Sequence, residues 1–430
     1  MPRQNLIALS ALALCVTFYS CGKSNSNPSN PSNPSNPTNP TPPTVGTMNI
    51  NLSYTNAASQ FELIISESAG KILLDTLAAP PATIVATIKT NDTLVDVTAI
   101  IDNTDGSYTI YTYKSINAST ISRLTKTDYN SFANPLRVGA TTRSHILYKN
   151  VPSSVLSYDL DQIPLFTNFF ENPPNLIRVS PAGDTVGVDY NNYPGNYSYL
   201  LFPSAGLYNL HLQTNTSDTV DCTHMDTASS ITFDRPEPFT IQPFFTFIGI
   251  FDTTDLTKVI GLSDFLQTAP SRPGVDFEYP KISVQKFELG FSALNASNDL
   301  LYYYGISSTI PKTLPLPKEA DFNISSAQKD NFSVTFPGNK PTFYFNMLTG
   351  PNISVTIYSR PDSGTIHPVS FLTNLKSKLL QTVNLSVLTP KQFGVDNFNG
   401  MNYSTYWPFI MTPTEPKHIS WDAYLTKSLP

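Results

Sequence analysis

The chain has little charge and no basic stripe. Only 13% of its 430 residues are charged, and 26 Lys and Arg stand against 32 Asp and Glu, which gives a formal net charge of −6. A protein that binds nucleic acid needs Lys and Arg side chains to neutralise phosphates. The composition therefore argues against nucleic acid as a partner.

Motifs that carry catalysis or hold cofactors are also lacking. The sequence has no Gly-x-Ser-x-Gly elbow, no His-Glu-x-x-His pair and no glycine-rich phosphate loop. Its five His residues are scattered singly, and no spacing matches a metal site. We predict no cofactor, no metal site and no catalytic residue, and we expect a non-enzymatic role. The alternative is a carbohydrate-active hydrolase or esterase whose residues assemble from distant loops.

Cysteine is scarce as well. The chain has three: Cys15 lies in an N-terminal apolar stretch, Cys21 follows that stretch, and Cys222 is the remaining thiol. A lone thiol forms no internal disulfide. His224 lies two residues after Cys222, and a neighbouring His is typical of a thiol that acts as a nucleophile or as a metal ligand. No second pair of ligands accompanies it, so we expect Cys222 to be packed in or near a strand.

The N-terminus has the pattern of an export signal. Met1-Pro2-Arg3 supplies positive charge, residues 6–19 form an apolar stretch, and Ser20 precedes Cys21. This stretch is shorter than the roughly 20 residues that span a membrane. Repeated Asn-Pro-Ser units then continue to about Thr44. Such a composition predicts an extended, solvated tether.

The order of signal, cysteine and tether resembles a lipoprotein of Gram-negative outer membranes. The resemblance implies a signal peptide over residues 1–20, lipidation at Cys21, and a disordered tether over residues 21–46. It departs from the usual lipobox at Phe18 and Tyr19, which are bulkier than the residues found there. It also implies a lipid-anchored protein of the outer membrane that faces the periplasm or the cell surface.

The rest of the chain has the composition of a β protein. It contains 22 Tyr, 26 Phe and 37 Pro with only 19 Gly, which favours strands separated by turns. Met48, Ile50, Leu52 and Tyr54 alternate with polar residues, as in a strand with one buried face. Residues 102–106, Asp-Asn-Thr-Asp-Gly, lie between two β-rich runs and predict a hairpin turn. They lack the downstream acid of a calcium loop.

These patterns predict an all-β fold of tandem sandwich domains with few short helices. A β-sandwich domain of immunoglobulin-like plan is expected over residues 47–120, and we expect it to fold by itself. A second β-rich domain is expected over 121–270 and a third over 271–430. Apolar residues at helical spacing predict one short helix within 368–380.

Both tryptophans of the chain lie in its C-terminal tail, among tyrosines and prolines. Flat aromatic faces beside polar groups suit the docking of a sugar ring or of a partner protein. The other interpretation is that these rings hold the last strand on its core. The candidate residues for binding a glycan or a neighbouring envelope protein are Tyr403, Tyr406, Trp407, Trp421 and Tyr424.

Six Asp-Thr dipeptides, each followed by Leu, Val, Ala or Thr, exceed the roughly one that chance would give at this composition. The pattern resembles the Asp-Thr-aliphatic acceptor of protein O-glycosylation in some Gram-negative bacteria. Asp and Thr also open strands at turns, which is the alternative explanation. The dipeptides begin at Asp75, Asp92, Asp184, Asp218, Asp226 and Asp252.

Overall fold

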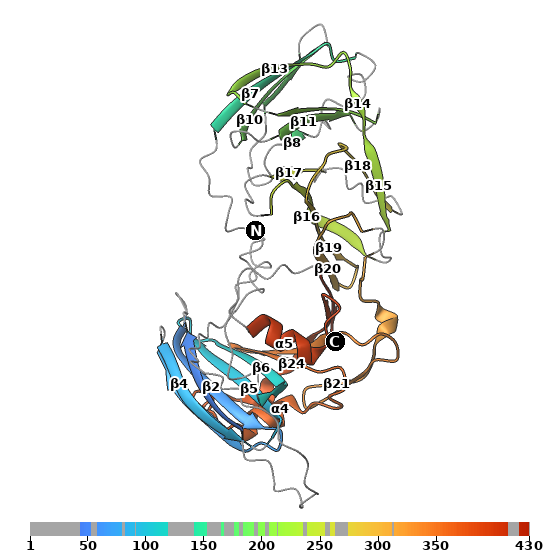
Figure 1. Cartoon of the computed structure of the whole chain (residues 1–430). Helices are drawn as coiled ribbons and strands as arrows, with labels where there is room; N and C mark the ends of the chain where they lie inside the picture. Colours follow the sequence, from blue (N-terminus) through green and yellow to red (C-terminus); the bar gives the residue numbers. More distant parts are fainter. Residues whose placement is uncertain are drawn as a thin grey trace, which may run out of the picture. The chain divides into compact units, whose positions relative to one another are not determined.

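The computed structural model is built mainly of β-strands (Figure 1). This confirms the predicted all-β fold class. The α-helices in the described residues are α4 (Pro368–Asn374) and α5 (Tyr403–Met411). The first confirms the helix expected within 368–380, whereas the second was not predicted. The structure describes residues 44–52, 58–79, 82–90, 92–118, 142–152, 165–166, 176–179, 184–192, 197–202, 206–212, 214–234, 239–253, 259–262, 274–311, 314–411 and 421–429.

The chain divides into two compact units rather than three consecutive domains. The first unit combines residues 1–133 with residues 317–417 and 426–430. The second consists of residues 134–316 and 418–425. This division differs from the expected boundaries, because the first unit joins segments from the two ends of the chain.

Long-range strand pairing is the reason for the difference. Strand β6 (Tyr108–Asn117) runs parallel to β24 (Ile353–Ser359). The register places Tyr108 opposite Ile353 and Tyr113 opposite Tyr358. The segment expected to be an independent domain therefore shares a sheet with strands far away in sequence, and the prediction that it is a separate domain is wrong. Local alternation defines a strand but does not say which distant strand completes its sheet.

In the first unit, the hydrogen-bonded order of described strands is β25-β23-β24-β6-β5-β2-β3. Two further antiparallel pairs are β1 with β4 and β21 with β22. The remaining bounds are β1 Thr44–Leu52, β2 Ala58–Glu67, β3 Ile72–Ala78, β4 Ala82–Thr90, β5 Leu94–Asn103, β21 Asn323–Gln328, β22 Asn331–Thr335, β23 Phe343–Gly350 and β25 Thr389–Phe398, with short 3-10 helices at Glu319–Asp321 and Leu385–Val387.

The hairpin between β5 and β6 confirms the turn predicted at residues 102–106. Gly106 has a φ of +79°, which is the left-handed region that glycine tolerates best. The N–H of Gly106 donates to the carbonyl oxygen of Asn103 at 3.0 Å. Asp105 accepts hydrogen bonds from the N–H and the hydroxyl of Ser107, at 2.9 and 2.6 Å. The turn chemistry read from the sequence therefore forms this hairpin.

The core of the first unit lies on both faces of β2 and β5. Phe61, Leu63 and Ile65 are buried on one face of β2, and Glu62 and Ile64 are buried on the other. A strand that is buried on both faces has a nearly continuous run of apolar residues in its sequence. Glu62 is the one charged residue in that run, and a buried carboxylate needs hydrogen-bond partners.

In the second unit, the described strands form several sheets. Their orders are β13-β7-β10-β9, β14-β12-β11-β8, β15-β18 and β17-β16-β19-β20. The bounds are β7 Thr142–Lys149, β8 Leu165–Phe166, β9 Leu176–Val179, β10 Thr185–Asn192, β11 Tyr197–Phe202, β12 Leu207–Leu212, β13 Ser217–Asp221, β14 Asp226–Thr227, β15 Ser229–Asp234, β16 Thr240–Ile250, β17 Val259–Gly261, β18 Gly274–Tyr279, β19 Lys286–Leu294 and β20 Leu300–Ser307.

The second unit also contains a β-hairpin. Strands β11 and β12 pair antiparallel, with Phe202 opposite Leu207, and Gly206 has a φ of +62° at the turn. The last strand, β26 (Trp421–Ser428), follows β20 in the strand order. Its residues 421–425 belong to the second unit.

Candidate functional site

Three of the five predicted ligand-binding residues are buried on α5. Tyr403, Tyr406 and Trp407 keep only 4, 7 and 6% of their surface exposed. The expectation that they form an exposed surface is therefore wrong. The physical reason is that the segment is helical, so residues at spacings of three and four share one face and bury together. A strand or a loop would have turned some of these rings to solvent.

The buried rings of α5 pack on strands of the first unit. Trp407 lies edge-on to Tyr113, with ring centroids 4.7 Å apart. Tyr113 in turn stacks on Tyr358 at 5.0 Å. Tyr406 lies 5.0 Å from Phe343. Such aromatic pairs each stabilise a core by about 0.5–1.5 kcal/mol beyond burial. The cluster is thus a structural core and not a docking face.

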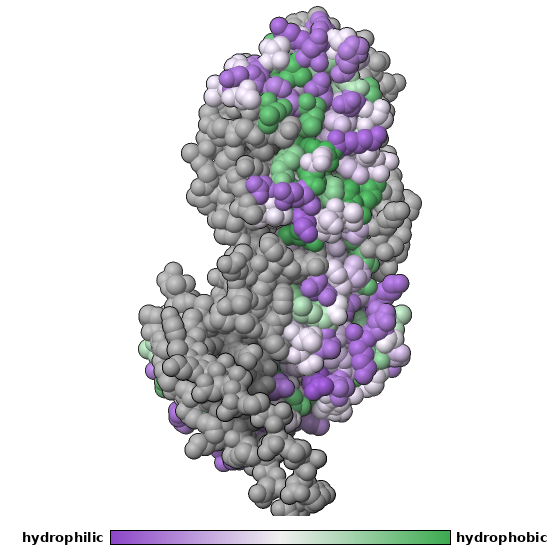
Figure 2. All heavy atoms as spheres, viewed as in Figure 1, coloured by the Kyte–Doolittle hydropathy of each residue, from purple (hydrophilic) through white to green (hydrophobic). Residues whose placement is uncertain are grey.

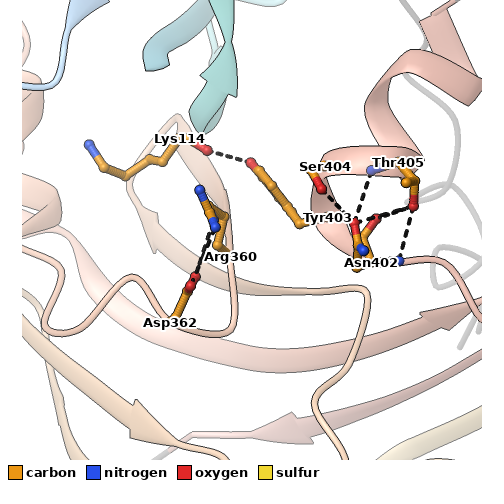
Figure 3. A network of polar contacts seen from close by, with 7 residues as sticks. All are labelled: Lys114, Arg360, Asp362, Asn402, Tyr403, Ser404 and Thr405. Carbon is orange, nitrogen blue, oxygen red and sulfur yellow. Dashed lines mark hydrogen bonds and ion pairs between the residues drawn. The ribbon is translucent and has the colours of Figure 1, made fainter. Parts of the chain in front are cut away.

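Hydrogen bonds fix the beginning of α5 (Figure 3). The side-chain oxygen of Asn402 accepts from the N–H of Thr405 at 3.0 Å and from the hydroxyl of Ser404 at 2.6 Å. This satisfies one of the N–H groups that a helix start leaves without a partner. The hydroxyl of Tyr403 donates to the backbone carbonyl oxygen of Lys114 in β6. These hydrogen bonds therefore fix the position of α5, and with it the aromatic cluster, relative to β6.

Asp96 and Lys114 form a partly buried ion pair beside this cluster. Their oxygen and nitrogen lie 2.6 Å apart, and the Asp96 side chain is only 2% exposed. Asp96 also accepts from the N–H of Ser115 at 2.8 Å. The register shifts here, so that two residues of β6 oppose one of β5, and Ser115 adopts a φ of +57°. The ammonium of Lys114 also lies 3.9 Å from the ring centroid of Phe371.

A second buried carboxylate belongs to Glu62. It accepts hydrogen bonds from the N–H groups of Lys378 and Leu379, at 2.8 and 3.1 Å, and from the hydroxyl of Ser377. Buried polar groups are stable when they are fully hydrogen-bonded, and bonds to a charged acceptor are the stronger ones. Glu62 thus fixes the turn that follows α4, which is a structural role.

Cys222 is a packed thiol, as the sequence predicts. It is fully buried directly after β13, and its N–H donates to the carbonyl oxygen of Lys149 at 2.8 Å. Burial, followed by the nearby charge of Asp221, raises the pKa of the thiol to about 11. A thiol of this kind is a poor nucleophile near neutral pH. Within the described ranges, no three His, Cys, Asp or Glu side chains come close enough to hold a metal ion.

The other two predicted residues lie on β26 and are half-buried. Tyr424 stacks on Tyr302 of β20, with centroids 4.7 Å apart and ring planes inclined by 18°. Trp421 precedes it at the start of the same strand. The tail therefore separates into a buried part on α5 and a half-exposed part on β26.

The half-exposed tyrosines occupy one face of neighbouring strands. Along β20 the buried residues Leu301 and Tyr303 alternate with the half-buried Tyr302 and Tyr304. Ser292 of β19 lies directly opposite Tyr302 and is half-buried too. We define the tyrosine face as the stacked pair Tyr302 and Tyr424 together with Tyr304, Ser292 and Asp422.

Apolar side chains otherwise reach the surface singly. The large hydrophobic residues that are exposed in the described residues are Ile72, Leu77, Leu212 and Val387. On the face drawn in Figure 2, hydrophobic and hydrophilic side chains lie interspersed over the described residues. Scattered apolar residues of this kind are ordinary on a protein surface. They single out no site comparable with the tyrosine face.

No family model and no curated protein sequence matches this chain. No helix of the described ranges has the length and apolar character needed to cross a membrane. Cys21 and residues 22–43 of the expected tether lie outside the described residues, so lipidation stays a prediction. Residues 44–46, which were expected to be disordered, belong to β1, so the predicted tether ends too late.

Proposed function

We propose that the protein is an outer-membrane lipoprotein that is anchored through Cys21 and binds a glycan outside the cytoplasm. The anchor is supported by the order of export signal, Cys21 and Asn/Pro/Ser-rich tether. Described β-structure begins at Thr44, just before the expected end of this tether at residue 46. Acyl chains on a cysteine contribute about 0.8 kcal/mol of membrane affinity per buried CH2 group.

The stacked pair of Tyr302 and Tyr424 is the observation that carries the binding proposal. Both rings of this stacked pair are only partly buried, so part of their apolar surface is open to a ligand. The C–H face of a sugar ring packs on such an area, and hydroxyl groups beside it need polar partners. Ser292 supplies a polar side chain on the same face.

A glycan fits this face better than a protein partner does. A stable protein interface takes roughly 20–30 residues a side, whereas the tyrosine face is defined by five residues.

In the first unit, the buried carboxylates Glu62 and Asp96 accept hydrogen bonds from backbone N–H groups. These carboxylates are engaged in structure, so they do not favour the alternative of a hydrolase or esterase.

The test is the binding of the mature chain to a panel of immobilised oligosaccharides. We expect at least one glycan to be retained. We expect Tyr302→Ala and Tyr424→Ala each to weaken its binding about ten-fold, which corresponds to roughly 1.4 kcal/mol. Tyr108→Ala is the matched control, because Tyr108 is a half-buried strand tyrosine of the first unit. Its affinity should stay at the wild-type value.

Two results would overturn the proposal. One is glycan binding that is unchanged in both tyrosine variants while their melting temperatures match the wild type. The other is a panel with no retained glycan together with capture of an envelope protein that Tyr424→Ala abolishes. The second result would assign the same face to a protein partner.

A further inference from the structure

We propose that Thr93, Thr219 and Thr227 carry O-linked glycans. These threonines belong to three of the six Asp-Thr dipeptides. The inference rests on the proposed export, because the modification is placed on the exported chain. It concerns glycans attached to this protein and is independent of the tyrosine face.

The six dipeptides share one kind of place in the fold. Three lie on β3, β13 and β14, and each of these strands is at the end of its sheet's strand order in the described residues. The others lie at strand ends: Asp92 comes just before β5, Asp184 just before β10, and Asp252 just after β16. A transferase can approach the backbone at such places, because no described strand pairs on one side or because the ladder of hydrogen bonds has ended.

Exposure divides the six threonines into two groups. Thr93, Thr219 and Thr227 are exposed. No hydrogen bond of their hydroxyl groups is present in the part of the chain that the structure describes. An acceptor hydroxyl must be reachable by the transferase, and these three exposed threonines meet that condition.

The second group is less accessible. Thr76, Thr185 and Thr253 are half-buried. The hydroxyl of Thr185 donates to the carboxylate of Asp184 at 3.0 Å, and that of Thr253 donates to the side-chain oxygen of Gln285 at 3.2 Å. These residues have the same sequence pattern, so they are matched internal controls for the role of exposure.

The chemistry is a glycosyl transfer from an activated donor. In each step, the threonine oxygen forms a bond to the anomeric carbon of a glycosyl diphosphate. The bond between that carbon and the diphosphate oxygen breaks, and the diphosphate leaves with the electron pair. The hydroxyl proton passes to a base of the transferase. No oxidant or reductant is needed, so atoms and electrons balance with this donor alone.

The test is peptide mass spectrometry with electron-transfer fragmentation, on the full chain isolated from the cells that naturally produce it. We expect glycan masses on the peptides of Thr93, Thr219 and Thr227, and unmodified peptides for Thr185 and Thr253. The intact mass should fall by one glycan in each of T93V, T219V and T227V. The triple variant should lose all three, and T185V should leave the intact glycan mass unchanged.

The outcomes separate this inference from the proposed function. A protein whose signal is removed and which fractionates with membranes, yet shows only unmodified Thr93, Thr219 and Thr227, contradicts the inference and leaves the anchor standing. Equal modification of all six threonines contradicts the role assigned to exposure. A protein that retains its signal in the cytoplasm contradicts the proposed function itself.

Discussion

The hydroxyl of Tyr403 donates a hydrogen bond to the carbonyl oxygen of Lys114, and so joins α5 to β6 across 289 residues of sequence. Trp407, one helical turn later, packs on Tyr113 in the same strand. The C-terminal aromatics are therefore part of what holds the N-terminal strands in the first unit. Substitutions on α5 are therefore expected to destabilise the protein more than substitutions on β26.

Trp407→Ala should lower the free energy of unfolding by about 3–5 kcal/mol, because it removes a large buried side chain and leaves a cavity. Tyr424→Ala should lower it by about 1 kcal/mol, since that side chain is only partly buried. Urea unfolding followed by near-ultraviolet circular dichroism measures both. Equal and small losses would contradict the burial of the α5 cluster.

Glu62→Gln should destabilise the protein by about 2–3 kcal/mol. The amide keeps one oxygen but turns an NH2 group toward buried N–H donors that lose their acceptor. Glu319→Gln is the matched control, because Glu319 pairs with Lys427 at the surface, and such pairs contribute no more than about 1 kcal/mol. Equal free energies of unfolding for the two variants would show that the turn does not depend on Glu62.

Alkaline pH should unfold the protein in a defined window. Burial raises the pKa of Tyr344 and of Tyr303 to about 12, and it raises the pKa of Tyr113 and Tyr358 further. An unfolded tyrosine has a pKa of about 10. The unfolded chain therefore releases these protons first, and the stability they confer is complete below about pH 10 and is lost as the pH rises toward 12.

Phenolate absorbance recorded together with near-ultraviolet circular dichroism measures this window. Exposed tyrosines should titrate near pH 10 with the dichroism unchanged, and a second group should titrate as the dichroism collapses. A single titration step near pH 10 with native dichroism throughout would contradict the burial of these rings.

Alkylation of Cys222 should be slow in the folded protein. With its thiol fully buried and its pKa raised to about 11, the thiolate fraction at mildly alkaline pH is small. Unfolding in urea should raise the rate of reaction with iodoacetamide at least about 100-fold. A Cys21→Ser background isolates the signal of Cys222 in the mature chain. A rate equal in native buffer and in urea would place Cys222 at the surface.

Local patterns predicted the elements better than their assembly. The turn residues Asp105 and Gly106 predicted the β5–β6 hairpin, and the alternation of Met48, Ile50 and Leu52 predicted β1. The parallel pairing of β6 with β24 left no local signal, because it depends on segments far apart in sequence. The immunoglobulin-like plan of the individual domains stays a prediction.

The tail shows where local propensity fails. Aromatic residues favour strands and Pro408 disfavours a helix interior, yet Tyr403–Met411 forms α5 because one face of the helix buries three rings. Of the site, the sequence indicated Tyr424 but missed Tyr302. A signal was present: alternation along residues 300–306 places Tyr302 and Tyr304 on one face, but it does not show that β26 brings Tyr424 onto that face.

Membrane fractionation of cells that produce the full chain with Cys21→Ser tests the central claim most directly. The wild type and a Cys222→Ala control should sediment with outer membranes, because both keep the lipid acceptor. We predict that the Cys21→Ser protein appears in the soluble fraction. A Cys21→Ser protein that sediments with membranes as fully as the wild type would contradict the lipoprotein account.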